Sequence, residues 1–355
     1  MYTDVVLVVG QFSNSPQTAI DDDTKGVIGK IAKRNKITEI PVINATATPS
    51  KSSIKLLDKK QYETGNKTVL DGNFDKVLNS GIQEIQEIVP SSDGVDYLEA
   101  LQKAVSNSNN KNSKQKTLIL LFGSGLNDSG ILNFTEDDIL TKTPDEVVSK
   151  IESKSFVKNK TLSGFDVEWI NLGDTIAPQI PLSGSQKSNL EAIYKSLLEK
   201  AGAGNVKIES KDKNDEEKVS VDTGGKRVKT VSSYKEGKPD YKNIHLTFDE
   251  RQLGNFLPDS ASLETPDKAR ESLASLVNMI KDESTLTVNI EGRIAKPKNS
   301  AKEDHSELAL QRANYIRDLL KNMGVTNSIE TTDTGSSKST GEEIATDRKI
   351  VVTFK

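Results

Sequence analysis

Short apolar runs alternate with helical patterns along the first 203 residues of the chain. Residues 5–9, 117–122 and 165–172 have the length and the continuous apolar character of buried strands. Elsewhere, apolar residues recur every three or four positions, which predicts helices at 18–34, 74–88, 96–105, 144–153 and 185–201. Continuous apolar strands separated by helices predict an α/β domain with a mostly parallel, doubly wound sheet covered on both faces.

A lapse in this pattern separates the two halves of the chain. Residues 204–242 contain few apolar side chains, and residues 211–218 are almost entirely charged. Such a composition is typical of a linker, with room for a hairpin through residues 219–221 and 228–231. We therefore expect one domain at residues 1–203, a charged linker at 204–242 and a second domain at 243–355.

Periodicity resumes after residue 243 in a different order. Strands are predicted at 244–248, 286–290, 328–334 and 349–354, and helices at 266–281 and 306–323. Gly324 follows the second helix at the position where a glycine commonly ends a helix. The order β-α-β-α-β-β predicts an α/β two-layer sandwich, with one mixed sheet and helices on one of its faces.

Composition narrows the classes of function. The 355 residues include no cysteine and two histidines, which excludes disulfides, thiolate zinc sites and cysteine nucleophiles. With 48 basic and 52 acidic residues the net charge is −4, which is not the charge balance of a nucleic-acid-binding protein. No apolar run is long enough to span a membrane. For an exported protein, we expect the signal or anchor upstream of Met1.

Several residues of the C-terminal half occur at the spacing of a known family. The entry to the first helix carries Phe256, Pro258, Ser260, Ala261 and Leu263, and the second strand carries Gly292. The second helix, its exit and the last strand carry Leu308, Arg312, Ala313, Leu320, Gly324, Val325, Asp347, Arg348, Lys349 and Ile350. In this order, these residues resemble the OmpA-like peptidoglycan-associated domain over about residues 243–355.

This resemblance implies a site for the diaminopimelate stem peptide of peptidoglycan. The free carboxylate of that peptide needs an arginine, and its ammonium needs an acidic side chain. Arg312 falls on the position of the carboxylate-binding arginine, and Arg348 belongs to the motif of the last strand. The family's aspartate falls on Ala295, so peptidoglycan binding is expected to be weakened. We expect Glu303 and Asp304, further along the same loop, to take the place of that aspartate.

The first 203 residues resemble a von Willebrand factor A domain. The segments VVLVVGQFSNSP, DGVDYLEALQKA, LILLFGSG and VEWINLGD follow one another in that family's order. The family binds a divalent metal with oxygen ligands from three loops, but Gln11, Val95 and Ser124 stand where the resemblance places those ligands. We expect a degenerate site without a metal, and Asp93, Asp96 and Asp128 leave open some other cation site.

The resemblances together predict a non-enzymatic, two-domain bacterial cell-envelope protein on the extracytoplasmic side, with no cofactor. We expect its C-terminal domain to associate with peptidoglycan and its N-terminal domain to bind an envelope protein partner. One alternative is that both domains are protein–protein interaction modules that bind neither peptidoglycan nor metal. The other is an enzyme that uses carboxylates alone, as glycosidases do.

Overall fold

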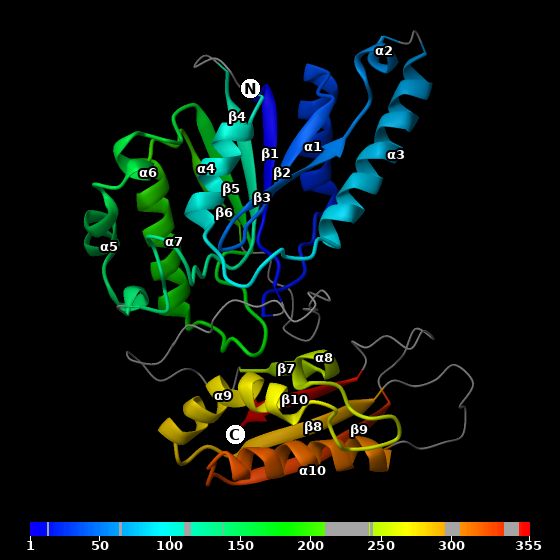
Figure 1. The fold of residues 1–355 in the computed structure, drawn as a ribbon, viewed down its shortest axis with the longest axis vertical. Helices are drawn as coiled ribbons and strands as arrows, with labels where there is room; N and C mark the ends of the chain where they lie inside the picture. The colour runs from blue at the N-terminus through cyan, green and yellow to red at the C-terminus, as the bar shows by residue number, and fades with distance from the viewer. Residues whose placement is uncertain are drawn as a thin grey trace. The chain divides into compact units, whose positions relative to one another are not determined.

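The computed structural model describes residues 1–12, 14–63, 66–109, 115–136, 138–209, 241, 244–294, 306–336 and 348–355. These residues form two compact units (Figure 1). The first unit includes residues 1–174 and 184–209, and the second includes residues 175–183 and the described residues from 241 to 355. Most of the predicted linker, including the hairpin expected within it, lies outside the described residues.

The first unit is built on one sheet, and the predicted mostly parallel architecture is confirmed. The strands run in the order β3-β2-β1-β4-β5-β6, and each neighbouring pair is parallel except the antiparallel pair of β2 and β3. Their bounds are β1 (Asp4–Val9), β2 (Glu39–Asn44), β3 (Ser50–Lys55), β4 (Thr117–Phe122), β5 (Phe165–Ile170) and β6 (Val206–Glu209). Every residue of the central strands β1 and β4 is buried.

Helices cover both faces of this sheet (Figure 1). They are α1 (Asp22–Asn35), α2 (Lys59–Tyr62), α3 (Lys67–Gln86), α4 (Tyr97–Asn107), the 3-10 helix η1 (Ile139–Thr141), α5 (Pro144–Ile151), α6 (Ser155–Lys158) and α7 (Gly184–Lys200). Alternate residues of β1 show the two faces. Val5, Leu7 and Val9 pack in one core with α1 and α3, and the equally buried Val6 and Val8 point to the opposite face.

Aromatic side chains fill the opposite face. Trp169 of β5 lies between Tyr97 of α4 and Tyr194 of α7, with ring centroids 5.2 Å and 4.4 Å away. Its indole Nε1 donates a hydrogen bond to the carbonyl of Gly123 at 2.9 Å. The single tryptophan is therefore part of the core, where its polar atom has a partner.

Capping side chains decide where the predicted helices begin. The first helix starts at Asp22 and not at residue 18, because the side chain of Asp21 accepts a hydrogen bond from the backbone N–H of Thr24 at 2.9 Å. The start of α5 is as expected. Thr143 caps it, Pro144 occupies its first turn, and Glu146 completes a capping box.

The strands β2 and β3 are absent from the sequence-based expectation. β2 contains Pro41, which interrupts its apolar run, and β3 has the largely polar sequence SKSSIK. β3 lies at the edge of the sheet, so most of its side chains remain at least partly exposed and need no apolar pattern. Position in the sheet, and not local periodicity, makes these segments strands.

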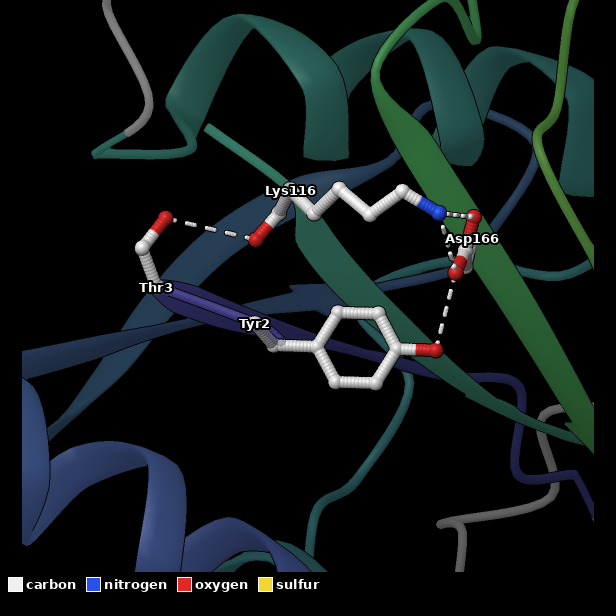
Figure 2. Close-up of polar contacts among 4 residues, drawn as sticks. All are labelled: Tyr2, Thr3, Lys116 and Asp166. Atoms are coloured by element: carbon white, nitrogen blue, oxygen red, sulfur yellow. Dashed lines mark hydrogen bonds and ion pairs between the residues drawn. The ribbon is translucent and has the colours of Figure 1, made fainter. Parts of the chain in front are cut away.

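A polar cluster ties the amino ends of three strands together (Figure 2). The hydroxyl of Tyr2 donates to Asp166 Oδ2 at 2.9 Å, and Lys116 Nζ lies 3.3 Å from the same oxygen. The hydroxyl of Thr3 donates to the carbonyl of Lys116 at 3.3 Å. Burial and the Asp166 carboxylate raise the pKa of Tyr2 to about 12. Asp166 is buried, and these contacts compensate for the loss of its hydration.

The second unit has the predicted mixed sheet with helices. Its strands run in the order β7-β10-β8-β9; β10 is antiparallel to both neighbours, and β8 is parallel to β9. The elements are β7 (Leu246–Asp249), α8 (Glu250–Leu253), α9 (Pro266–Asp282), β8 (Val288–Ile294), α10 (Ser306–Asn322), β9 (Ile329–Ser336) and β10 (Lys349–Phe354). Buried and half-buried residues alternate along β8, as expected of a sheet that is covered on one face.

A close approach of backbones joins α10 to β8. A Cβ atom on Gly292 of β8 would lie 2.0 Å from the carbonyl oxygen of Ala309 in α10, so only glycine fits there. After α10, Gly324 has a φ of 91° and ends the helix as predicted. In the described part of the chain, no helix is long and apolar enough to cross a membrane.

Candidate functional site

Three charged side chains meet at one end of the sheet in the second unit. Glu250 begins α8 directly after β7, Arg348 precedes β10, and Arg312 lies in α10. β7 and β10 are antiparallel, with Asp249 opposite Lys349, so Glu250 and Arg348 are neighbours across the strands. The backbone N–H of Glu250 donates to the carbonyl of Arg348 at 3.1 Å. Strand pairing thus brings together residues that are far apart in the sequence.

Arg312 is buried, with 6% of its surface exposed. Its Nε donates to the carbonyl of Ser260 at 3.0 Å, and its guanidinium carbon lies 4.6 Å from the centre of the Phe256 ring. Burial lowers the pKa of Arg312; the Glu250 carboxylate opposes this effect, and the positive charge of Arg348 adds to it. Among the described residues, its terminal nitrogens Nη1 and Nη2 have no hydrogen-bond partner.

Glu250 is the acidic member of the cluster. Its Oε1 accepts a hydrogen bond from Nη1 of Arg348 at 3.2 Å, and its side chain is 9% exposed. Its Oε2 is buried and accepts no hydrogen bond from any residue that the structure describes. Burial raises the pKa of Glu250, while the charges of Arg348 and Arg312 act in the opposite direction.

Local backbone structure holds these groups in place. Asp249 and Gln252 form a capping box that fixes the start of α8 and therefore the position of Glu250. The contact between Gly292 and Ala309 sets the distance of α10 from the sheet, and Arg312 lies on the same helix one turn later. Phe256, which packs under the guanidinium, is held by a bridge to Leu263. The cluster is thus supported by two helices, α8 and α10, by the sheet and by the loop that carries Phe256.

The structure brings together two of the predicted peptidoglycan-binding residues, Arg312 and Arg348, which both act on Glu250. The other two, Glu303 and Asp304, lie outside the described residues, as does Ala295. Glu250 was not among the predicted residues. Its sequence position, at a helix start directly after a strand, is that of an ordinary exposed acid, and only its pairing with Arg348 shows otherwise.

In the first unit, Gln11 has internal partners at the position where the sequence resemblance expects a metal ligand. Gln11 is buried: its Nε2 donates to the carbonyls of Gln86 and Ile88 at 3.1 and 2.9 Å. Its Oε1 accepts from the backbone of Thr18 at 2.7 Å. Gln11 therefore holds the loop after β1 against the end of α3.

The acidic residues near this edge of the sheet also have structural partners. Asp128 Oδ1 accepts from the backbone N–H of Val95 at 2.7 Å, and Asp96 Oδ1 accepts from two N–H groups at the start of α4. Burial raises the pKa of Asp96. Ser124 is also buried, and its Oγ accepts a hydrogen bond from the backbone N–H of Leu126 at 3.4 Å. In the described part of the chain, no group of three or more histidine, aspartate or glutamate side chains could hold a metal ion.

A comparison with protein families matches the OmpA family over residues 255–349, so the second unit contains an OmpA family domain. This match includes Phe256, Gly292, Arg312 and Arg348 and ends at Lys349. It covers the part of the chain in which Arg312 and Arg348 meet Glu250, although Glu250 itself precedes the matched residues. A search of curated proteins finds no match.

Solved structures similar to this chain align with about one third of it. The periplasmic domain of MotB is 16% identical, with 32% of this chain and 62% of that chain covered and a TM-score of 0.27. The OmpA-like domain of FopA1 from Francisella tularensis is 22% identical, with 32% of this chain and 74% of that chain covered and a TM-score of 0.25. An outer membrane protein from Borrelia burgdorferi is 24% identical, with 33% of this chain and 92% of that chain covered and a TM-score of 0.26. The chain therefore spans less than two thirds of the first of these domains.

Proposed function

We propose that this chain is a non-enzymatic protein of the bacterial cell envelope, on the extracytoplasmic side, and that its OmpA family domain binds the stem peptide of peptidoglycan. The observation that carries the proposal is Arg312. It is a buried arginine within the matched family domain, and its two terminal nitrogens have no partner among the described residues. A buried arginine fork in this state is suited to bind a carboxylate through two parallel hydrogen bonds.

The surroundings of Arg312 favour a carboxylate ligand. The Phe256 ring covers one side of the guanidinium, and the Ser260 carbonyl fixes its Nε, so the fork is held in one orientation before a ligand arrives. Burial lowers the local dielectric and strengthens an ion pair formed there. Arg348 lies close enough to add positive charge. In this proposal Glu303 and Asp304 remain predicted ligand residues on the segment between β8 and α10.

For the N-terminal unit we propose binding to an envelope protein partner, as its resemblance to a von Willebrand factor A domain implies. The internal hydrogen bonds of Gln11 and Asp128 support a mode of binding that uses no metal in that family's manner. The alternative, in which both units bind only proteins, makes the opposite prediction for peptidoglycan. It requires that the fork of Arg312 serve only the packing of the domain.

A sedimentation assay with purified peptidoglycan tests the proposal. The full chain should sediment with the insoluble polymer, and Arg312→Ala should lower the affinity about 10- to 100-fold, the cost of losing a charge-assisted bidentate contact. Arg312→Lys should rescue little, because an ammonium lacks the planar fork. The matched control is Arg317→Ala, since Arg317 lies on the same helix and pairs with Asp318 and Asn314. Binding of Arg312→Ala equal to that of the parent would refute the proposal.

Calorimetry with a soluble stem peptide that contains diaminopimelate distinguishes peptidoglycan binding from the alternative of two protein-interaction modules. Heat of binding that is abolished in Arg312→Ala supports the peptidoglycan proposal. Absence of heat with the parent chain, together with no sedimentation, supports two protein-interaction modules instead. Thermal unfolding of each variant shows whether the second unit remains folded.

A further inference from the structure

One segment of the second unit comes from the first half of the chain. Residues 175–183 lie in the sequence between β5 and α7, which are elements of the first unit, yet they belong to the second unit. We call this segment the strap. Its residues Ala177 and Ile180 are 1% and 2% exposed, and both belong to the hydrophobic core of the second unit. Other members of that core are Ile244, Leu246, Phe248 and Leu253. The strap therefore supplies buried apolar side chains to a unit that is otherwise encoded by the C-terminal part of the chain.

A buried amide fastens the strap to α8. The Nε2 of Gln252 donates a hydrogen bond to the carbonyl of Ala177 at 2.6 Å. The Oε1 of the same side chain accepts a hydrogen bond from the backbone N–H of Asp249 at 2.8 Å, and this bond completes the capping box of α8. Gln252 is buried. One side chain thus holds the strap with its donor and fixes the start of α8 with its acceptor.

The two ends of the strap are tied together in the first unit. Asp174 directly precedes the strap and is buried, and its Oδ1 lies 3.2 Å from Nζ of Lys187 in the first turn of α7. The backbone N–H of Gly173 donates to the carbonyl of Ser124 at 2.8 Å, which holds the chain just before the strap to the loop after β4. We call Asp174 and Lys187 the base of the strap.

The sequence of the strap suits a docked segment. Residues 175–183 read TIAPQIPLS and contain no charged side chain and two prolines. Proline restricts the conformations of a free chain, so less conformational entropy is lost when the segment docks. Buried side chains pack at the density of an organic crystal, and a segment that supplies two of them cannot move without disturbing the core. A charged linker has neither property.

We infer that the strap is a coupling element, through which a change at its base in the first unit alters α8 in the second unit. Movement of the base draws the Ala177 carbonyl away from Gln252 and Ile180 out of its core. The released amide holds the cap less firmly, so the start of α8, which carries Glu250, loosens. Because coupling between two sites is reciprocal, loosening of α8 acts equally on the base. This coupling does not depend on what either unit binds.

Hydrogen–deuterium exchange of the full chain, resolved into peptides by mass spectrometry, tests the packing of the strap. Ile180→Ala should speed the exchange of the slowest amides of β7 and β10 at least about 30-fold, because it leaves a cavity in the core of the second unit. The milder Ile180→Val should speed the same amides about 2- to 12-fold. The matched control is Ile170→Val in β5, whose side chain is buried in the first unit and which should speed β1 and β4 instead. Faster exchange in Ile180→Ala that is confined to the strap, or is equal in β1 and β4, would overturn the inference.

Gln252→Glu tests the link between the strap and α8. It keeps an acceptor for the N–H of Asp249 and removes the donor to Ala177, so exchange should become faster in the peptides that cover the strap and α8. The control is Gln61→Glu, which makes the same change in the capping box of α2 and should leave both peptides unchanged. Unchanged exchange of the strap and α8 in Gln252→Glu would overturn the inference.

Lys187→Met tests transmission from the base. It removes a charge partner of the buried Asp174 in the first unit, and it should speed exchange in the peptides that cover α8 about threefold or more. Lys195→Met is the control, because Lys195 is exposed on the same helix and has no ion pair among the described residues. It should leave α8 unchanged. If Lys187→Met also leaves α8 unchanged, or if Lys195→Met has an equal effect, the coupling is overturned.

Discussion

Replacement of Gly292 by alanine tests the contact that positions Arg312. The backbone conformation of Gly292 is open to alanine, because its φ is not among the positive values of this chain. The added Cβ, however, would lie 2.0 Å from the carbonyl oxygen of Ala309 and 2.7 Å from its carbonyl carbon. Both are backbone atoms of α10, so no side chain can rotate away. The helix and β8 must separate.

The size of the effect follows from these distances. Ordinary contact begins at 3.4 Å, so relief of the 2.0 Å approach needs a movement of about 1.4 Å. Overpacking of this kind costs about 1–3 kcal/mol, and alanine recovers about 0.4–1 kcal/mol by restricting the unfolded chain. A net loss of about 1–2 kcal/mol lowers the Tm of a unit of this size by roughly 5–15 °C. The same movement displaces Arg312 and lengthens its 3.0 Å hydrogen bond to Ser260.

Differential scanning calorimetry of the full chain, combined with peptidoglycan sedimentation, measures both effects. Gly292→Ala should lower the transition of the second unit and weaken binding, and it should leave the first unit unchanged. Gly26→Ala is the matched control, because a Cβ on Gly26 of α1 meets no atom within 4 Å and alanine favours a helix. That variant should be neutral or slightly more stable. An unchanged transition in Gly292→Ala, or an equal loss in Gly26→Ala, would refute the reasoning.

Two further predictions concern the first unit. Burial raises the pKa of Tyr62 to about 12, and its hydroxyl donates to the carbonyl of Ile37 at 2.7 Å. Because the pKa in the folded state is above the ordinary value of 10.0, this stabilisation is complete below pH 10 and is lost as the pH rises toward 12. Urea unfolding between pH 8 and pH 12 should show that loss, and Tyr62→Phe should reduce its slope while costing about 1 kcal/mol at pH 8. Thr143→Ala removes the cap of α5 and should lower stability by about 1 kcal/mol, whereas Thr143→Ser should retain the cap; equal stability of the two variants would contradict the role of the hydroxyl.

Much of the fold could be predicted because it depends on local patterns. Periodicity and proline placement predicted the strand at 117–122 and the helix starts at Pro144, Pro266 and Ser306. The structure has these elements at the predicted positions. Periodicity failed for β2 and β3. These strands depend on pairing with β1 and on an edge position in the sheet, which a window of neighbouring residues does not contain.

The candidate site likewise contains residues that the sequence identified and residues that only the structure revealed. Arg312 was identified from its motif, but the motif leaves open whether that arginine is solvated, and the packing of α10 on Gly292 and Phe256 buries it. Glu250 could not be found from the sequence, because its partner Arg348 lies 98 residues away. Gln11 shows the same limit, since two of its three hydrogen bonds reach the carbonyls of Gln86 and Ile88, which lie 75 and 77 residues away.

The sequence by itself thus determined two α/β units, the kinds of elements in each, and the arginine expected to bind a carboxylate. Hydrophobic periodicity and short motifs are local properties, and they can be read without knowledge of the fold. Tertiary structure alone decided which charged groups are buried together and which polar atoms remain without partners. Burial and pairing are properties of distant segments brought into contact, so the cluster of Glu250, Arg348 and Arg312 became visible only when β7, β10 and α10 were seen together.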